Sequence, residues 1–376
     1  MIISRTPFRI SFFGGGTDYP TWYRAHGGAV LATTINKYCY LTCRRLPPFF
    51  EHRYRVVYSR MENCRTIDEI VHPAVRETLR YLNLSCGLEI HHDADLPARS
   101  GLGSSSAFTV GLLHALYGLK GYMPTKQQLA MESIYIERER AKDTVGSQDQ
   151  VLAAFGGLSH ITFLTNGQIT VKPMTLCAER VNELNARLML FYTGIKRTAS
   201  AVAQSYVPDI KSKEQEMRIL GDLVDEGIAI MRGGQDITRF GKLLHEAWQT
   251  KRDLSSKVSN GHIDDIYNEA MAAGAIGGKV IGAGGGGFML FFVHPCDQAA
   301  VRQRLHSLVH VPFKFESSGT HIIFFDREEE YAAEEQDGTT RSIRVFREAY
   351  ELPSQARHGT DGGNPLSQTI RQGSFS

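Results

Sequence analysis

Several features that mark other classes of protein are missing from this sequence. No apolar run approaches the ~20 residues that cross a bilayer, and residues 1–7 lack the longer apolar core and cleavage site of a signal peptide. The six cysteines are scattered, with no Cys-x-x-Cys pair, so we expect reduced thiols in a cytoplasmic protein and no cysteine-held metal. The net charge of +2 gives no reason to expect a nucleic-acid or membrane partner.

The length and patterning predict two domains. A chain of 376 residues with 42% hydrophobic and 22% charged residues is typical of a folded enzyme. Strand and helix patterns fill residues 1–180, and a new pattern opens near residue 187 with a strand over 188–192 and almost continuous helix over 199–273. We therefore expect domains at 1–180 and 187–326. Residues 327–376 are acidic, then rich in Gly, Ser and Gln, which predicts a mostly disordered tail.

The most informative segment is residues 97–107, with the sequence PARSGLGSSSA. It lies between a strand-like run (88–92) and a run that predicts a helix over 105–119. The glycines permit a tight turn, and the serines stand where the helix would begin. The free N–H groups of a first helical turn bind anions, so this segment is interpreted as a phosphate cradle. It is not a P-loop, because no Gly-Lys-Ser/Thr follows the glycines. The alternative is a flexible loop, but such loops rarely run straight into a long apolar helix.

A second segment, residues 9–19, combines a strand with a glycine turn. The strand carries Arg9, and Asp18 follows Gly14-Gly15-Gly16. A carboxylate just past such a turn can accept hydrogen bonds from two sugar hydroxyls at once. The alternative is an aspartate in an ordinary turn.

Two further segments combine charge and glycine. Helices are predicted over 125–141, with Thr125 as N-cap, and over 147–155. The Glu-Arg repeat at 137–140 could be a solvated helix face, and Asp149 could be a helix cap. Four consecutive glycines (284–287) follow Lys279 between two strands, which indicates close approach of the backbone to another group; the alternative is a mobile linker.

Together these segments resemble the three signatures of the GHMP kinase superfamily, which includes galactokinase, homoserine kinase and mevalonate kinase. The signatures occur in order at 9–19, 97–107 and 279–287. The resemblance implies an α+β, two-domain fold, with an N-terminal domain like ribosomal protein S5 and a ferredoxin-like C-terminal domain. The active site is then expected in the cleft between them. The sequences of these segments are most similar to those of bacterial D-glycero-D-manno-heptose 7-phosphate kinases, and L-fucose kinases share much of the same sequence.

The resemblance also implies roles for individual residues, with ATP and Mg²⁺ as cofactors. Asp149 aligns with a catalytic base and Arg9 with the arginine beside it. Mg²⁺ is expected at Ser105 or Ser106 together with Glu139, although Glu137 stays possible because the spacing is one residue off the mevalonate kinase pattern. The ATP phosphates are expected at Ser100, Gly101, Leu102, Gly103, Ser104, Ser105 and Ser106.

The implied reaction is phosphorylation of the anomeric hydroxyl of heptose 7-phosphate to the 1,7-bisphosphate, on a route to GDP-heptose. A kinase of an unphosphorylated sugar such as L-fucose is the alternative, and a non-catalytic ligand-binding relative should have lost the base or the magnesium glutamate. The oligomeric state stays open, and Arg24 and Lys37 are further candidates for holding the sugar phosphate. The sugar phosphate is expected to contact Asp18, Gly15, Gly16, Gly284, Gly285, Gly286, Lys196 and Arg197.

Overall fold

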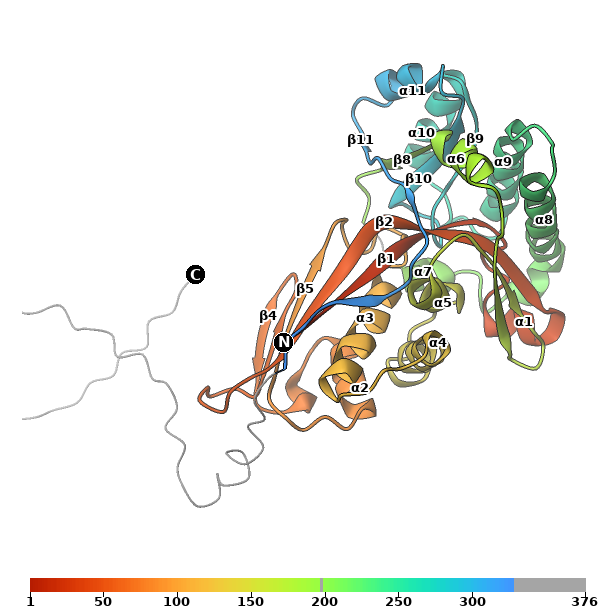
Figure 1. Cartoon of the computed structure of the whole chain (residues 1–376). Helices are drawn as coiled ribbons and strands as arrows, with labels where there is room; N and C mark the ends of the chain where they lie inside the picture. Colours follow the sequence, from red (N-terminus) through yellow and green to blue (C-terminus); the bar gives the residue numbers. More distant parts are fainter. Residues whose placement is uncertain (197–198, 328–376) are drawn as a thin grey trace, which may run out of the picture.

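The computed structural model describes residues 1–196 and 199–327, which build two sheets covered by helices (Figure 1). In the described residues the first sheet has nine strands, and its main path runs β13-β1-β2-β5-β3-β4. The strand β12 and the hairpin of β6 and β7 attach to β2 beside this path. The strands are β1 (Ile2–Phe13), β2 (Gly28–Arg45), β3 (Tyr54–Val57), β4 (Met61–Cys64), β5 (Leu88–Ala94), β6 (Ser159–Phe163), β7 (Ile169–Pro173), β12 (Phe315–Glu316) and β13 (His321–Phe325).

The long antiparallel pair of β1 and β2 forms the spine of this sheet. Their register runs from Ile2 opposite Cys43 to Phe13 opposite Leu31. The half of β1 from Phe8 to Phe13 is buried at every position, because helices pack on both of its faces. Apolar and polar residues alternate from Phe8 to Phe12, so Arg9 and Ser11 lie on the opposite face of the strand from Phe8, Ile10 and Phe12 and are buried there.

The helices of the first half lie under the sheet in Figure 1. The longest, α3, buries ten of its 16 residues and packs against β1 and β2. Thr125 accepts a hydrogen bond from the Gln128 N–H (3.1 Å), which confirms the predicted N-cap. This half contains α1 (Pro20–His26), the 3₁₀ turn η1 (Ile67–Glu69), α2 (Pro73–Tyr81), α3 (Ser104–Leu119), α4 (Lys126–Tyr135), the π-helical turn η2 (Ile136–Arg140) and α5 (Gln148–Phe155).

The second half builds a smaller antiparallel sheet in the order β11-β8-β10-β9. The predicted strand at 188–192 and the helix-rich stretch that follows it are confirmed. The elements are α6 (Ala178–Ala186), β8 (Leu188–Tyr192), α7 (Ala199–Ala203), η3 (Ile210–Lys213), α8 (Glu214–Arg232), α9 (Thr238–Arg252), α10 (Gly261–Ala272), β9 (Ala275–Val280), β10 (Phe288–Val293), α11 (Gln298–Arg304) and β11 (Val309–His310).

The expected domain 187–326 would keep the last strands in the second half, but both of them join the sheet of the first half. β12 pairs with β2, and β13 pairs with β1, with Phe325 opposite Ile2. A short apolar strand such as β13 has the same pattern whichever sheet it joins, so the sequence pattern does not reveal its partner. The tail expected to be disordered, apart from Arg327, lies outside the described residues.

The two halves share a buried interface. The rings of Phe12 and Phe13 on β1 meet Phe240 of α9 edge to face, with centroids 5.3 and 5.0 Å apart. The buried Lys279 ammonium of β9 donates to the Phe12 carbonyl (2.7 Å). Burial, together with the neighbouring cations Lys251 and Arg9, holds the pKa of Lys279 well below its usual value. These contacts place β1 of the first half directly beside the second half.

Candidate active site

An arginine and an aspartate from distant parts of the chain form a bidentate pair. Arg9 lies on β1, and Asp149 lies in the first turn of α5. The Arg9 Nε and Nη2 atoms each donate to one Asp149 oxygen at 2.7 Å, and Nη1 donates to the Gly101 carbonyl at 2.5 Å. Arg9 is buried, whereas the Asp149 side chain is 26% exposed. The pair therefore fixes the orientation of a carboxylate that is still open to solvent on one side.

The serine-rich loop leads into α3 beside this pair. Gly103 is the N-cap residue of α3 with φ +75°, a left-handed conformation that favours glycine, and no side chain caps the helix. A Cβ at Gly103 would lie 3.1 Å from Arg9 Cγ and 3.5 Å from Asp149 Cγ, so the loop packs tightly on the pair. The N–H groups of Ser104, Ser105 and Ser106 form the first turn of a 16-residue helix, where an anion is favoured.

A serine in the first turn of α3 contacts a buried glutamate of η2. Ser106 Oγ donates to Glu137 Oε2 at 3.0 Å, and Gln150 Nε2 donates to the same oxygen at 2.6 Å. Burial raises the pKa of Glu137 to about 7, although hydrogen bonds from Thr109, Gln150 and Ser106 oppose the rise. Among the described residues Glu137 Oε1 is buried and accepts no hydrogen bond. An orphaned carboxylate oxygen beside a hydroxyl is a donor set that suits a hard cation such as Mg²⁺.

The structure does not bring Glu139 to the serines. Glu139 is exposed, whereas Glu137, the open alternative, is buried and contacts Ser106. Both glutamates lie in η2, where the Ala141 N–H donates to the Ile136 carbonyl (2.8 Å) across five residues. Side chains two positions apart in a helical turn point to different sides, so only one of the two can face α3. Of the two candidate serines, Ser106 is buried beside Glu137 and Ser105 is exposed.

Asp18 has a different place from the one expected. It is fully buried, with Oδ1 accepting from the Gly16 N–H (3.0 Å) and Oδ2 from the Gln148 N–H (3.2 Å). Burial and the nearby Asp149 carboxylate raise the pKa of Asp18. A Cβ at Gly146 would lie 1.9 Å from Asp18 Oδ2, which shows how closely the chain wraps this carboxylate. Asp18 therefore connects the glycine turn to the start of α5, and its contact with the sugar stays a prediction.

Two polar side chains near the glycine turn, Ser11 and Gln148, reach the site although the sequence pattern predicts no role for them. Ser11 Oγ and Gln148 Oε1 are buried and have no hydrogen-bond partner among the described residues. A Cβ at Gly15 would lie 3.5 Å from Ser11 Oγ and 3.6 Å from Gln148 Nε2, so both side chains reach this glycine. Gln148 directly precedes Asp149, and Ser11 lies two positions after Arg9, so their unsatisfied atoms suit a polyhydroxylated ligand. Neither residue type carries a motif signal by itself, which is why the sequence pattern did not single them out.

The third glycine cluster packs against the protein itself. Gly284 and Gly286 have positive φ, and a Cβ on them would lie 2.7 Å from the Val258 carbonyl and 2.6 Å from Ile195 Cγ2. Gly285 also has positive φ and donates its N–H to the Val258 carbonyl (2.7 Å). The expected close approach of the backbone is therefore found, but with protein atoms as its partners.

The next glycine, Gly287, links the second half to the serine-rich loop. A Cβ on it would lie 2.0 Å from the Ser100 carbonyl oxygen, which also accepts from the Phe288 N–H at 3.1 Å. This contact fixes the start of the loop. Of the two expected phosphate-binding cations, Lys196 is exposed after β8, and Arg197 lies outside the described residues.

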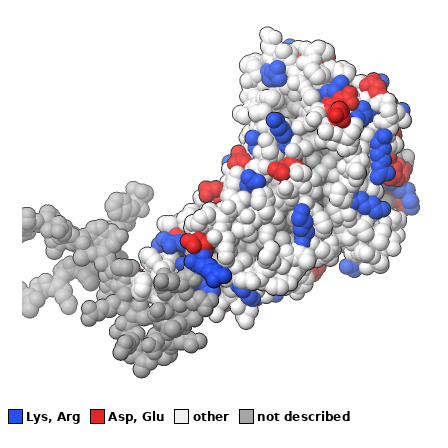
Figure 2. Space-filling model, viewed as in Figure 1, with Lys and Arg blue, Asp and Glu red and all other residues white. Residues whose placement is uncertain are grey.

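Other kinds of site are not found in the described part of the chain. Within residues 1–196 and 199–327 no three His, Cys, Asp or Glu side chains form a metal-binding group, and no helix there has the length and apolarity to cross a membrane. On the face drawn in Figure 2 acidic and basic side chains are interspersed. A groove of about 630 Å³ between the start of α6 and the end of α8 shares no residue with the site described above.

Comparison with known proteins identifies the family. The GHMP kinases N terminal domain matches residues 69–157, and the GHMP kinases C terminal domain matches residues 228–310. The D-glycero-alpha-D-manno-heptose 7-phosphate kinase of Campylobacter jejuni is 31% identical over 306 residues, which are 78% of this chain and 90% of that protein. The L-fucokinase/L-fucose-1-P guanylyltransferase of Bacteroides fragilis is 25% identical over 81% of this chain and 36% of its own length.

Solved structures show the same fold. A D-glycero-D-manno-heptose 1-phosphate kinase from Bacteroides thetaiotaomicron superposes with a TM-score of 0.71 at 24% identity, over 87% of this chain and 100% of that one. The Lactococcus lactis galactokinase, solved with galactose, superposes with a TM-score of 0.65 at 17% identity, over 85% and 94% of the two chains. The chain therefore belongs to the GHMP kinase family, and it is an ATP-dependent kinase with the two-domain α+β fold of that family.

Proposed function

We propose that this chain phosphorylates the anomeric hydroxyl of D-glycero-D-manno-heptose 7-phosphate in the cytoplasm, with ATP as donor and Mg²⁺ as cofactor. The observation that carries the reaction type is the Arg9–Asp149 pair beside the uncapped start of α3. The substrate is inferred from the similarity to the Campylobacter jejuni heptose 7-phosphate kinase, which this chain covers over 90% of its length. The product would be the 1,7-bisphosphate, a precursor for GDP-heptose.

Asp149 is proposed as the catalytic base. Arg9 occupies one side of the carboxylate, so its open side is left for the acceptor hydroxyl. As the sugar oxygen bonds to the γ-phosphorus of ATP, its proton passes to Asp149 and ADP leaves. The anomeric hydroxyl is more acidic than an ordinary alcohol, so Asp149 has mainly to orient it and accept the proton late. Arg9 also places a fixed positive charge near the transferring group.

The other residues are proposed to hold the phosphates and the metal. The N–H groups at the start of α3 and the loop from Ser100 to Ser106 would bind phosphate oxygens. Ser106 Oγ and the orphaned Glu137 Oε1 would hold Mg²⁺, which neutralises phosphate charge when it is bound. One hydroxyl and one carboxylate suffice, because Mg²⁺ keeps several waters and phosphate oxygens in its shell.

A sugar without a phosphate, such as L-fucose, is the second candidate substrate. It is favoured by the 25% identity with a protein whose name includes L-fucokinase. A non-catalytic role is disfavoured, because both the Arg9–Asp149 pair and the Ser106–Glu137 contact are present. The two substrates differ in the need for a cation that faces the 7-phosphate, and Lys196 and Arg197 are the proposed cations.

The test is ADP release by the purified chain with heptose 7-phosphate, the dephosphorylated heptose, L-fucose, galactose and mevalonate. We expect the highest kcat/KM for heptose 7-phosphate. Replacing Lys196 and Arg197 together by alanine should raise KM for heptose 7-phosphate by about tenfold or more and leave KM for ATP unchanged. An equal kcat/KM for the dephosphorylated heptose would refute the 7-phosphate assignment and favour the fucokinase-like alternative.

A further inference from the structure

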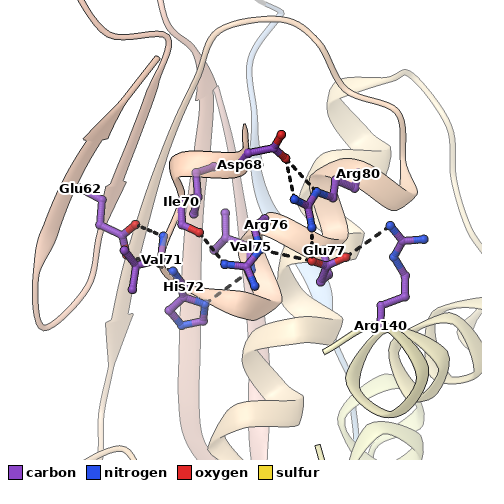
Figure 3. A network of polar contacts seen from close by, with 10 residues as sticks. All are labelled: Glu62, Asp68, Ile70, Val71, His72, Val75, Arg76, Glu77, Arg80 and Arg140. Atoms are coloured by element: carbon purple, nitrogen blue, oxygen red, sulfur yellow. Dashed lines mark hydrogen bonds and ion pairs between the residues drawn. The ribbon is translucent and has the colours of Figure 1, made fainter. Parts of the chain in front are cut away.

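A buried glutamate outside the site is surrounded by three arginines (Figure 3). Glu77 lies on α2 and is 7% exposed. Its Oε1 atom lies 3.2 Å from Arg76 Nε and 2.5 Å from Arg80 Nη1, and its Oε2 atom lies 3.3 Å from Arg140 Nη2. A carboxylate that is taken out of water needs such partners, because leaving it unpaired would be strongly unfavourable.

Two of the three arginines tie Glu77 to its own neighbourhood. Arg76 also donates to the Ile70 carbonyl (2.8 Å), and Arg80 also pairs with Asp68 (2.5 Å). Both contacts fix α2 to the segment around η1 that precedes it. Arg76 and Arg80 therefore connect Glu77 only to α2 and the segment before it, and neither contact involves the candidate active site (Figure 3).

The third arginine comes from a different element. Arg140 is the last residue of η2, and among the described residues Glu77 is the one acidic side chain that it contacts. Three positions earlier the same turn carries Glu137, which faces Ser106 and Gln150. The turn is thus held at two points, on one side by α3 and α5 and on the other by α2.

The conformation of η2 explains why a second support is needed. The Ala141 N–H donates to the Ile136 carbonyl (2.8 Å), and the Asp143 N–H donates to the Glu137 carbonyl (2.9 Å), so the turn is wider than an α-helix. Such π-helical turns are rare, short and frequent at functional sites. Without an outside contact the turn could adopt ordinary α-helical hydrogen bonds, which would change the directions of its side chains.

We propose that Glu77 is a positioning residue that keeps Glu137 directed at Ser106, through its ion pair with Arg140. This inference rests on the proposed role of Glu137 as a Mg²⁺ ligand. Glu77 itself contacts neither the serines nor Asp149, so its effect on the metal is transmitted by the turn. Loss of a group that is hydrogen-bonded directly to a metal ligand typically changes metal affinity by about 10–100-fold, and we expect the lower end of that range because Glu77 acts through Arg140.

The primary test uses Arg140→Gln, which leaves Glu77 with its two local arginines, together with Glu77→Gln. Two quantities are measured: the Mg²⁺ concentration that gives half-maximal turnover, and Mn²⁺ binding followed by electron paramagnetic resonance with a non-hydrolysable ATP analogue. We expect each variant to weaken Mn²⁺ binding and raise the half-maximal Mg²⁺ concentration by about tenfold. At saturating Mg²⁺ kcat should stay close to that of the unaltered protein. The double variant should show no larger shift than either single one, because both break the same contact.

Asp68→Asn is the matched control. Asp68 belongs to the same network through Arg80, is 78% exposed at its side chain and makes no contact with Arg140. Its loss should leave both metal measurements unchanged. A shift as large as that of Arg140→Gln would show that any damage to α2 has this effect, and it would overturn the specific role of Glu77.

Glu137→Gln tests the ligand role of Glu137 separately from the positioning role of Glu77. If this variant binds Mn²⁺ like the unaltered protein, the ligand role of Glu137 fails and the inference fails with it. If it loses Mn²⁺ while Arg140→Gln and Glu77→Gln do not, only the positioning role is overturned. Circular dichroism checks folding, and if Glu77→Gln does not fold, Arg140→Gln alone decides.

Discussion

The Asp149 carboxylate is held by Arg9 and is open to solvent on one side, so its role as a base can be tested by a substitution that preserves its shape. Asp149→Asn keeps the shape of the side chain but loses the negative charge and the basic oxygen. We expect kcat to fall about 10²–10⁴-fold, because that is the usual effect of losing a positioned base. Binding of an ATP analogue, measured by calorimetry, should change little, since the phosphates are proposed to bind at α3. A folded variant that keeps more than about a tenth of kcat would show that Asp149 is not the base.

The two glutamates of η2 provide a matched pair of substitutions. Glu137→Gln should raise the Mg²⁺ concentration needed for half-maximal turnover, because it replaces the orphaned carboxylate oxygen by a neutral amide group. Glu139→Gln should leave it unchanged, because Glu139 is exposed and Ser106 donates its hydrogen bond to Glu137 instead. A Mg²⁺ titration of both variants, with ATP held saturating, measures the difference. The opposite ranking would return the ligand role to Glu139.

The sequence was informative about side chains whose signal is local and less informative about side-chain direction. Arg9, Asp149 and Ser106 stand in recognisable segments, and the structure brings their segments together. The choice between Glu137 and Glu139 required knowing that the helix widens at Ile136, and spacing in the sequence assumes a regular helix. The place of Asp18 depended on burial by Gly146 and Gln148, which is a tertiary property.

At the scale of elements, the glycine before β10 controls the contact between the two halves. Gly287 has φ +90° and would place a Cβ 2.0 Å from the Ser100 carbonyl oxygen. Gly167, in the turn between β6 and β7, has the same φ of +90° but no atom within 4 Å of its Cβ position. Gly167→Ala should therefore cost only the backbone strain, roughly 1–2 kcal/mol.

Gly287→Ala carries the same strain and adds a clash with backbone. We expect it to lower the free energy of unfolding clearly more than Gly167→Ala, in urea titrations of both variants. It should also raise KM for ATP, because Ser100 opens the phosphate loop. Equal losses of stability would mean that the loop moves aside without cost and that the contact does not matter.

Elements differ in how well the sequence predicted them, for a physical reason. The strand at 188–192 and the cap at Thr125 depend on residues close in sequence, and both are confirmed. The partners of β12 and β13 are set by contacts with strands near residues 2–5 and 34–35, about 300 residues away. No local pattern contains that information.

At the scale of the whole molecule, two half-buried histidines contribute to the dependence of stability on pH. Burial lowers the pKa of His72 and of His114 to about 4, while in an unfolded chain histidine titrates near about 6.5. Between these values the unfolded state binds protons that the folded state does not. The contribution of these histidines to the free energy of unfolding is therefore complete above pH 6.5 and is lost as pH falls toward 4, whereas Glu137, whose pKa is raised to about 7, contributes in the opposite direction below pH 7.

Urea titrations at several pH values measure this slope. His114→Gln should make the slope shallower by up to about one proton, because one of the two groups is then absent. His114 contacts Thr320 at 3.3 Å, and a glutamine can replace that hydrogen bond. A slope that His114→Gln leaves unaltered would contradict the assignment.

The return of β13 to β1 has a consequence for the chain while it is being made. The N-terminal amine donates to the Asp326 carbonyl (2.8 Å), and the Asp326 N–H donates to the Met1 carbonyl (2.9 Å), so Met1 and Asp326 close the described chain into one ring. At translation rates of about 5–20 residues per second, the edge of β1 emerges from the ribosome roughly 15–60 s before its partner exists. During that interval an unpaired strand edge is open to neighbouring nascent chains. Slower growth and dilute expression should therefore favour recovery of native protein, since they lower the chance of an encounter before the ring closes.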